Sequence, residues 1–197
     1  MGTTVEYQLV RWDDSVVPKM TTERLVLRPM LDVDIDRYLA SAPATDAVGT
    51  LGAMPDRAAY SELCRHQGEA WRQEGMGYLV VAERGDNAAV GHVELRPIER
   101  AAGSRAAEIT YSIDPPHRGR GYAVEAVAAM LLLAFEIIGV DPVVAFVPLD
   151  NAASFAVAMR LGFDHVGESV VHGSRMRRML LSFARWKLGP TAVLAKI

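Results

Sequence analysis

Two arginines and two glycines stand where a helix is expected to begin. Arg118, Gly119, Arg120 and Gly121 follow the alternating segment AEITYSID and precede a long apolar run. Arginines at a helix start oppose the positive end of the helix dipole, and glycine is a poor helix former. A bound anion would resolve both conflicts, because free N–H groups, close backbone approach at glycine and arginine side chains all favour phosphate. The sequence therefore predicts a phosphate or pyrophosphate site at this loop.

The residues around this loop do not match either of two established phosphate-binding motifs. A P-loop requires a lysine followed by serine or threonine after its glycine, whereas Tyr122 and Ala123 follow Gly121. A dinucleotide fingerprint would continue Gly119 and Gly121 with a third glycine, and Val124 stands at that position. The predicted phosphate therefore belongs to a ligand other than the nucleotides that these two motifs bind.

The arrangement that remains resembles the acetyl-CoA loop of the GNAT superfamily of N-acetyltransferases. Arg118, Gly121 and Ala123 match that family's pattern of glutamine or arginine, two residues, glycine, one residue, and glycine or alanine. The stretch GRGYAVEA is similar to the branch that contains ribosomal-protein N-terminal acetyltransferases. Three further segments fall where that branch has comparable ones, namely RLVLRPM, GHVEL and NAASFAVAMRLGF. The resemblance covers roughly residues 22–186.

The resemblance implies a fold and a cosubstrate. The fold is an α/β (α+β) GNAT fold, with a mixed, mostly antiparallel sheet of about seven strands, flanked by helices. The sheet is splayed between its fourth and fifth strands, and the pantetheine arm of acetyl-CoA lies in the gap, with no metal. The backbone of Ser112 and Ile113 would pair with that arm as an added strand does. Backbone N–H groups would hold the pyrophosphate, from Arg118, Gly119, Arg120, Gly121, Tyr122 and Ala123.

Acetyl transfer to an amine by direct attack, as in GNAT enzymes, also needs a base. Glu94 in GHVELR and Glu108 in AEITYS lie on predicted central strands beside the gap. A carboxylate there could take an ammonium proton directly or through water. The alternative for each is a structural ion pair with an arginine such as Arg96 or Arg105. A backbone N–H near Ile113 is the expected oxyanion donor.

The same resemblance bears on the acid that protonates the departing thiolate. Many GNAT enzymes place a tyrosine seven residues after the asparagine of the downstream helix, and here that position is Ala158. In the ribosomal-protein branch the serine three residues after the asparagine is implicated, which is Ser154 here. The alternative is a serine that satisfies backbone donors in a first helical turn. Asn151 could touch the CoA arm, cap its helix or do both.

Periodicity predicts the elements that position these residues. Helical spacing predicts helices after Asp32, over 56–74, from 121 to about 138, and over 151–162. Alternation predicts strands in RLVLRPM, GYLVVAER, VGHVELRPI, AEITYSID, VVAFVP, FDHVGES and SRMRRMLLSFARW. Residues 1–20 lack a clear period and are predicted to be an N-terminal arm, followed by a single domain over 21–197.

Composition and charge narrow the class of protein. A net charge of -3 and a pI near 6.0 give no polybasic signature, which argues against a nucleic-acid partner. The one cysteine, Cys64, excludes an internal disulfide and fits a reducing cytosol. The longest uncharged apolar run, 126–135, is far shorter than the roughly 20 residues that cross a bilayer, and the first residues carry no apolar signal core. We therefore expect a cytoplasmic protein with no membrane partner.

The sequence leaves the acceptor open. The leading function is an acetyl-CoA-dependent N-acetyltransferase that acts on a primary amine, either a protein N-terminus or a small amine such as an antibiotic, polyamine or amino acid. A non-catalytic acyl-CoA-binding regulatory module is the alternative of a different class, supported by Ala158 at the place of the tyrosine. Arg175, Arg177 and Arg178 alternate on a predicted strand, where they would face solvent or a partner subunit in a homodimer.

Overall fold

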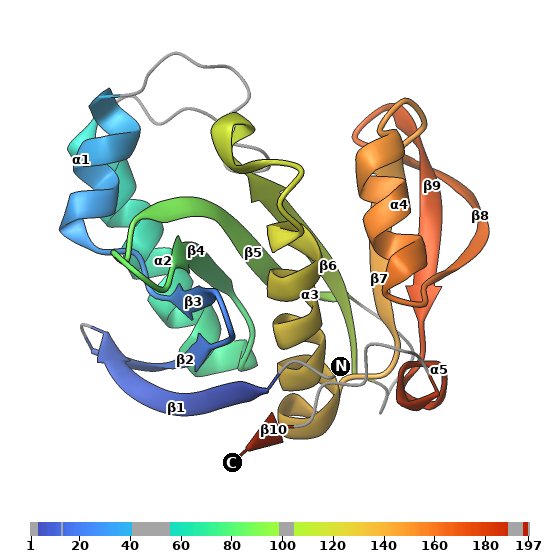
Figure 1. Cartoon of the computed structure of the whole chain (residues 1–197), viewed down its shortest axis with the longest axis horizontal. Helices are drawn as coiled ribbons and strands as arrows, with labels where there is room; N and C mark the ends of the chain where they lie inside the picture. The colour runs from blue at the N-terminus through green and yellow to red at the C-terminus, as the bar shows by residue number, and fades with distance from the viewer. Residues whose placement is uncertain (1–3, 13, 41–55, 99–104, 189–194, 197) are drawn as a thin grey trace.

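The computed structural model describes residues 4–12, 14–40, 56–98, 105–188 and 195–196. These residues form a mixed α+β fold around a ten-stranded sheet with the order β10-β1-β2-β3-β4-β5-β6-β7-β9-β8 (Figure 1). The strands are β1 (Val5–Trp12), β2 (Ser15–Thr21), β3 (Leu25–Arg28), β4 (Tyr78–Glu83), β5 (Ala89–Ile98), β6 (Ala106–Ile113), β7 (Val143–Pro148), β8 (Asp164–Val171), β9 (Ser174–Leu181) and β10 (Ala195–Lys196). The helices are α1 (Asp32–Ala40), α2 (Arg57–Glu74), the 3₁₀ turn η2 (Pro115–His117), α3 (Tyr122–Leu132), its π-helical continuation η3 (Leu133–Ile138), α4 (Ala152–Arg160) and α5 (Phe183–Lys187).

The sheet opens between β6 and β7. These two strands run parallel and pair only where Ala107 faces Val143 and Glu108 faces Val144. Beyond that point they diverge, so that a gap widens toward the end of the sheet that carries η2 and the start of α4 (Figure 1). They are the strands that the sequence predicts as fourth and fifth, and the predicted splay is confirmed.

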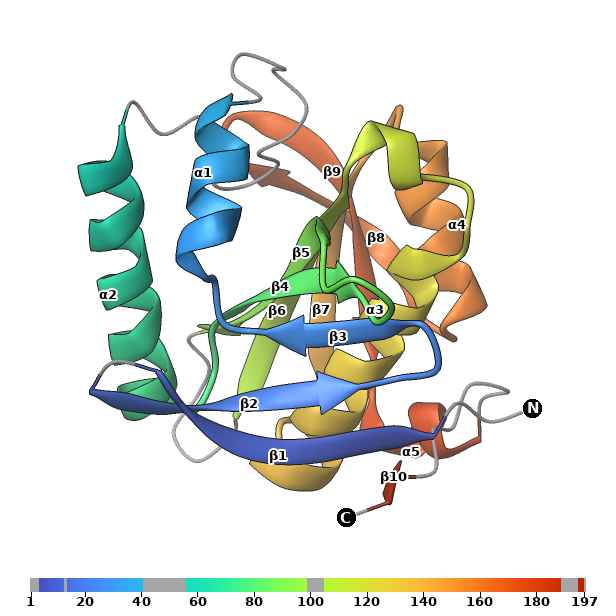
Figure 2. The same ribbon diagram turned by 60° about the vertical axis from the view of Figure 1, so that its left-hand side comes forward.

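Helices cover both faces of the sheet. Helix α3 packs on one face, and α1 and α2 lie on the other (Figure 2). Strand β4 shows how the sequence encodes this burial. Tyr78 and Val80 pack in the cluster under α1 and α2, whereas Leu79 and Val81 join the main core with α3. Because successive side chains of a strand alternate between faces, a strand covered on both faces reads as a continuous apolar run.

Helix α3 is buried around most of its circumference. Its apolar residues from Ala126 through Leu132, with Leu133 to Phe135 of η3, are in the main core. The apolar run of this helix is therefore explained by burial within the protein core. No helix in the part of the chain that the structure describes is long and apolar enough to cross a membrane.

The N-terminal residues are part of the sheet, which corrects the prediction of an arm over residues 1–20. Strand β1 pairs antiparallel with β2, and β2 pairs with β3. Val5, Val17 and Met20 are fully buried in the core. The period is hard to see in the sequence because β1 exposes Leu9 on its surface, and Pro18 interrupts β2.

The prediction of one strand over SRMRRMLLSFARW is wrong at its C-terminal end, where the structure has a short helix. Strand β9 ends at Leu181, and the following residues turn into helix α5. Ser182 caps this helix, because its hydroxyl accepts the backbone N–H of Arg185 at 3.2 Å. Ser182 is a local signal for a helix start, and the prediction from alternation did not take it into account.

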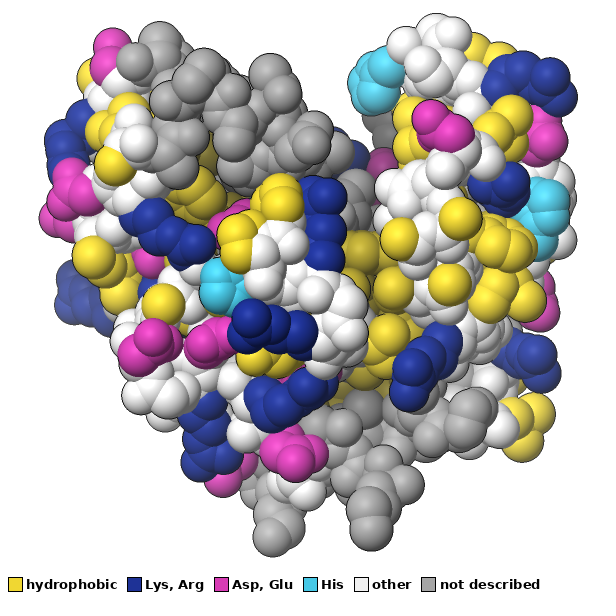
Figure 3. Space-filling model, turned by 45° about the horizontal axis from the view of Figure 1, so that its top comes forward, with side chains coloured by type: hydrophobic (Ala, Val, Ile, Leu, Met, Phe, Trp, Pro, Cys, Tyr) yellow, Lys and Arg dark blue, Asp and Glu magenta, His cyan; other side chains and the backbone are white. Residues whose placement is uncertain are grey.

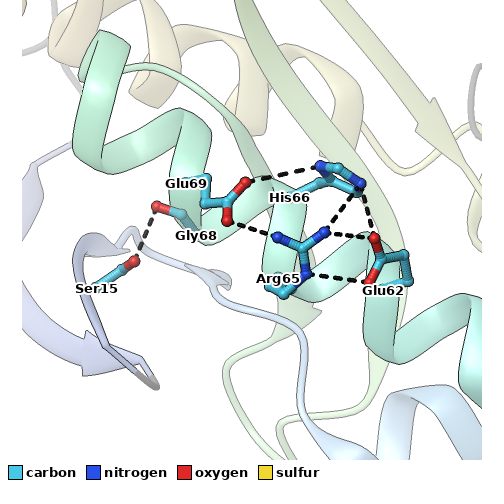
Figure 4. A network of polar contacts seen from close by, with 6 residues as sticks. All are labelled: Ser15, Glu62, Arg65, His66, Gly68 and Glu69. Atoms are coloured by element: carbon cyan, nitrogen blue, oxygen red, sulfur yellow. Dashed lines mark hydrogen bonds and ion pairs between the residues drawn. The ribbon is translucent and has the colours of Figure 1, made fainter.

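A buried hydrogen bond joins helix α2 to the N-terminal hairpin, in addition to the packing of Trp71 in the main core. The hydroxyl of Ser15 donates to the carbonyl of Gly68 at 2.9 Å (Figure 4). A Cβ at Gly68 would lie 3.0 Å from that hydroxyl, so the glycine permits the close approach. On the exposed side of the helix, Arg65 pairs with Glu62 and Glu69. Exposed pairs of this kind contribute little to stability, so the buried contact matters more.

The arginine cluster on β9 makes contacts within its own chain. Arg175 pairs with Glu168 at 2.6 Å on the neighbouring strand β8. Arg177 donates to the carbonyl of Pro148 at 3.1 Å and lies over the ring of Phe155 at 5.0 Å. These contacts account for both side chains without a second subunit, and the homodimer stays a prediction.

Candidate active site

A cleft of about 400 Å³ lies at the splay, between the loop before α3, strand β6 and helix α4. In Figure 3 the surface is hollowed between the two parts of the molecule that flank this splay. Most of the residues predicted for acetyl-CoA binding and acid catalysis line the cleft: Ser112, Ile113, Arg118, Gly119, Gly121, Tyr122, Ala123, Asn151 and Ser154. Segments about 40 residues apart in the sequence therefore meet at one site.

The loop before α3 has the backbone geometry that the glycines predict. Gly119 and Gly121 have φ angles of 76° and 81°, in the left-handed region where other residues are strained. Gly121 is the N-cap of α3. No described residue accepts a hydrogen bond from the N–H groups of residues 119–124. A helix start with a row of such donors is a ready site for phosphate oxygens.

The two loop arginines take different directions. Arg118 lines the cleft, and its Nε donates to the carbonyl of Ile113 at 2.8 Å, which braces the end of β6. The side chain of Arg120 is not part of the cleft lining, and its Nη1 lies 3.6 Å from Oε1 of Glu83. The structure thus brings Arg118 to the predicted site but directs the Arg120 side chain away from it, leaving only the backbone of Arg120 available.

Glu125 anchors the loop from beneath, and the sequence analysis missed it. This buried carboxylate accepts the Thr22 hydroxyl at 2.6 Å, the Arg24 backbone N–H at 2.9 Å and the Arg24 Nε at 2.7 Å. Arg24 in turn donates to the carbonyl of Arg120 at 2.8 Å. An acid in the first turn also interacts favourably with the helix dipole. Its signal was present in the sequence, because Glu125 is a lone charge in an otherwise apolar run.

Gly91 allows the end of β6 to approach β5 closely. A Cβ at this position would lie 2.1 Å from the carbonyl oxygen of Ser112 and 3.0 Å from the Cα of Ile113. Any other residue would push the two strands apart at the place where the family resemblance implies pairing with pantetheine. The glycine of GHVEL is therefore required by a tertiary contact.

The predicted carboxylates lie on the sheet face away from α3. On β5 and β6 the facing residues are Glu94 with Thr110 and Arg96 with Glu108. The Thr110 hydroxyl donates to Glu94 at 3.4 Å, and the amide of Gln67 on α2 donates to it at 3.5 Å. Neither carboxylate is part of the cleft lining on the α3 side.

The two carboxylates differ in environment. The side chain of Glu94 is 9% exposed, and burial raises its pKa above the usual value, against the opposing effects of Arg96 and its hydrogen-bond donors. Glu108 is 21% exposed and pairs with Arg96 at 3.2 Å. Arg105, the other arginine considered, instead donates to backbone carbonyls of Glu74 and Ile138. Arg96 thus lies within ion-pair distance of both carboxylates, 3.2 Å from Glu108 and 3.8 Å from Glu94, and Glu94 differs from Glu108 in its deeper burial and its raised pKa.

Helix α4 presents the predicted acid and its neighbours to the cleft. The Asn151 side chain accepts the backbone N–H of Ser154 at 2.9 Å and so caps the helix, while both residues also line the cleft. Across the gap, the hydroxyl of Tyr111 donates to the carbonyl of Ser154 at 3.4 Å. Burial raises the pKa of Tyr111, which keeps the phenol protonated and available as a donor. Two hydroxyls therefore lie in the same part of the cleft.

The site has no metal-binding pattern within the described residues. There, no group of three or more histidine, cysteine, aspartate or glutamate side chains is arranged to hold an ion. His92 lies beside Glu94 on the same face of β5 and is almost fully buried against the ring of Tyr78, with ring centroids 5.1 Å apart. Burial lowers the pKa of His92 to about 4, so its imidazole is neutral at pH 7.

Comparison with known proteins decides the family. The sequence profile of the acetyltransferase (GNAT) domain matches residues 24–164. The chain belongs to the GNAT family. It is a GNAT-type N-acetyltransferase.

Relatives of this acetyltransferase support the assignment over most of its length. It is 28% identical over 152 residues to the uncharacterized N-acetyltransferase YoaA of Bacillus subtilis (strain 168), covering 76% of this chain and 85% of that protein. Its fold is similar to ribosomal-protein-S5-alanine acetyltransferase from Vibrio fischeri, with a TM-score of 0.69, 20% identity and coverage of 85% and 98% of the two chains. It is also similar to a chimera of spermidine N-acetyltransferase SpeG from Vibrio cholerae and hSSAT, with a TM-score of 0.63, 21% identity and coverage of 83% and 98%. At these identities the solved structures show the shared fold.

Proposed function

We propose that this acetyltransferase moves the acetyl group of acetyl-CoA to a primary amine by direct attack, and that a protein N-terminal amine is its acceptor. The observation that carries the proposal is the splay, which has a row of N–H donors on one side and the buried Glu94 carboxylate on the other face of the sheet. Cosubstrate and acceptor would then approach from opposite faces and meet at the end of β6.

The residues present fit acetyl-CoA. The pyrophosphate would lie on the N–H groups of residues 119–124, where the backbone of Gly119 is open, since a Cβ there would meet nothing within 4 Å. The pantetheine would run along Ser112 and Ile113, which line the cleft. The backbone N–H of Ile113 would then donate to the oxygen of the tetrahedral intermediate.

Glu94 is the base in this proposal, and Glu108 supports it. The acceptor ammonium loses one proton to Glu94, and the free amine then bonds to the thioester carbon. As the carbon–sulfur bond breaks, the nitrogen loses its second proton and the departing thiolate gains one, so that an amide and a free thiol result. A carboxylate whose pKa lies nearer neutrality accepts a proton more effectively than an ordinary one. The Arg96 guanidinium, 3.8 Å from Glu94, opposes the rise that burial causes in the pKa of Glu94, while the neighbouring Glu108 carboxylate adds to that rise.

Either Ser154 or Tyr111 could protonate the thiolate, and substitution separates them. We expect Ser154→Ala to lower kcat by about tenfold, because a thiol with a pKa near 8.5 needs protonation less than an alkoxide would. The affinity for acetyl-CoA should stay within about twofold, since the phosphate donors lie on the other helix. Steady-state kinetics and calorimetry measure the two effects.

Tyr111→Phe is the matched comparison for the serine. It removes only the hydroxyl that faces the Ser154 carbonyl. A normal kcat in folded Ser154→Ala together with a tenfold loss in Tyr111→Phe would transfer the acid role to the tyrosine. Urea unfolding should show little change for Ser154→Ala, because the cap of this helix is the bond from the Ser154 backbone N–H to the Asn151 side chain, which the substitution keeps.

Thiol release from acetyl-CoA, measured with a library of peptide N-termini and small amines, tests the proposal. We expect release that depends on the amine, and faster release with peptides than with polyamines, amino acids or aminoglycoside antibiotics. Faster release with a small amine would show that the acceptor is a small amine and not a protein N-terminus, while the proposed acetyl transfer would still stand. Binding of acetyl-CoA without amine-dependent release from any acceptor would support the non-catalytic alternative.

We also propose a cytoplasmic location. The single cysteine, Cys64, leaves no internal disulfide to form in an oxidising compartment. The predicted reaction uses a thioester and a free amine, which fits a reducing compartment.

A further inference from the structure

The carboxylate of Glu83 is the meeting point of three residues from the loop before α3. Glu83 is the last residue of β4 and is paired across the sheet with Leu25. Its Oε1 accepts the Tyr122 hydroxyl at 2.9 Å, and it lies 3.3 Å from Nδ1 of His117 and 3.6 Å from Nη1 of Arg120. One oxygen atom on a rigid strand thus contacts three loop side chains.

The three partners bracket the N–H donors of the loop. His117 ends η2, Arg120 stands just before the N-cap, and Tyr122 is the first residue of α3. Between them, Gly119 and Gly121 have no side chains and adopt left-handed φ angles, so they contribute no contacts that would hold the loop in place. The geometry of the donors must therefore come from contacts that the flanking side chains make outside the loop.

A second brace acts on the same residues from another direction. Arg24, held by Glu125, donates to the carbonyl of Arg120 and places its guanidinium 5.0 Å from the centre of the Tyr122 ring. Tyr122 is thus fixed by its hydroxyl through Glu83 and by its face through Arg24. Each brace originates in a strand of the sheet or the turn beside it, and so ties the loop to the core.

We propose that Glu83 is a positioning residue that preorganises the phosphate loop for acetyl-CoA. This inference rests on the proposed function, since it assumes that the loop binds the pyrophosphate. Glu83 does not touch the ligand in this scheme. It holds His117, Arg120 and Tyr122 so that the N–H groups of the loop converge before the ligand arrives, which lowers the entropic cost of binding.

Charge alone would give Glu83 the opposite effect. A carboxylate near an anion site repels the ligand, so its removal would tighten binding if electrostatic repulsion dominated. One of its partners, Arg120, offsets part of that charge, and solvent screens what remains at a partly exposed site. The direction of the affinity change therefore distinguishes positioning from repulsion.

Calorimetric binding of coenzyme A to the full chain tests the inference. We expect Glu83→Ala to raise Kd by about tenfold, which corresponds to about 1.4 kcal/mol. Glu83→Gln should raise it by only about threefold, because its amide oxygen can still accept the Tyr122 hydroxyl. Asp86→Asn is the matched control, since it removes a nearby negative charge whose carboxylate accepts only the N–H of Ala88, and Kd should stay within about twofold.

Kinetics and a second variant separate positioning from general damage. With an amine that is turned over, Glu83→Ala should raise KM for acetyl-CoA and leave kcat within about twofold at saturation. Tyr122→Phe should weaken binding in the natural background but add little in the Glu83→Ala background, because both changes remove one contact. Additive effects of the two changes would contradict the inference.

The possible failures are distinguishable. If the natural chain does not bind coenzyme A, both the proposed function and this inference are overturned. If it binds, but Glu83→Ala and Glu83→Gln bind equally well or more tightly, the proposed function survives and the positioning role is wrong. A lower Tm with unchanged affinity per folded molecule would assign Glu83 to stability alone.

Discussion

Glu94→Gln is expected to lower kcat by about a hundredfold at pH 7, near the lower end of the range for loss of a general base. The amide has nearly the same shape as the carboxylate and can still accept from Thr110, so the fold should persist. What it cannot do is take the ammonium proton. As pH rises toward the pKa of the acceptor amine, the free amine forms without help, and the deficit should narrow. A pH profile of kcat and kcat/KM for both proteins measures this.

In the natural enzyme we expect the same group to set the acidic limb of the profile. Burial raises the pKa of Glu94, so activity should be lost as pH falls through that raised value, where the carboxylate becomes protonated. Glu94→Gln should lack this limb. Its remaining dependence should follow the acceptor amine alone.

Glu108→Gln is the matched control for this prediction. It removes a carboxylate from the neighbouring strand on the same face, but one that is paired with Arg96 at 3.2 Å. We expect a loss of less than about fivefold, of similar size at every pH, since only a partly exposed ion pair is broken. If instead Glu108→Gln gave the large loss that recovers at high pH, the base would be Glu108 and the role of Glu94 would be wrong.

Gly121→Glu should weaken acetyl-CoA binding by about a hundredfold, or about 2.7 kcal/mol. Two effects combine at this N-cap. The φ of 81° is costly for a residue with a Cβ, so the loop would relax away from the observed geometry. The new carboxylate would also lie where we place the pyrophosphate, and its Cβ would approach Nη2 of Arg24 at 3.4 Å. Calorimetry with acetyl-CoA measures the loss.

Gly139→Glu provides a control on the same helical segment. Gly139 also has a left-handed φ, 75°, and lies at the far end of η3, where a Cβ would meet nothing within 4 Å. The substitution therefore adds the same charge and similar backbone strain without reaching the loop. Affinity should stay within about twofold, although stability will fall by roughly 1 kcal/mol. Equal weakening by both variants would remove the phosphate assignment from the loop.

Local signals account for the parts that the sequence predicts well. The αL conformation at Gly119 and Gly121, the caps at Asp56 and Asn151, and the continuous apolar run of β4 depend on neighbouring residues or on simple alternation. The family and the splay are predicted differently, from the resemblance of several motifs to the GNAT superfamily. The structure also brings the predicted loop, Ser112, Ile113 and Ser154 to one cleft.

Prediction failed where pairing or capping at a distance decides the outcome. Residues 5–12 and 15–21 form strands because β3 offers β2 a partner, and β2 then pairs with β1, although β1 itself alternates weakly. The Arg120 side chain turns from the expected phosphate toward Glu83, a residue 37 positions earlier in the chain. Neither the pairing of β2 with β3 nor the pairing of Arg120 with Glu83 can be predicted from the residues next to β2 or to Arg120.

The sequence by itself determined the chemistry that the loop can offer, because glycine conformation, helix dipole and backbone donors are properties of a short segment. Only the tertiary structure decided which groups support that chemistry. It buries Glu94 beneath Gln67 and leaves Glu108 more exposed, with Arg96 near both. It also brings Glu83 and Glu125 to the loop from two directions. The reason is physical: the pKa of a carboxylate and the rigidity of a loop depend on what covers and contacts them, and those neighbours come from distant parts of the chain.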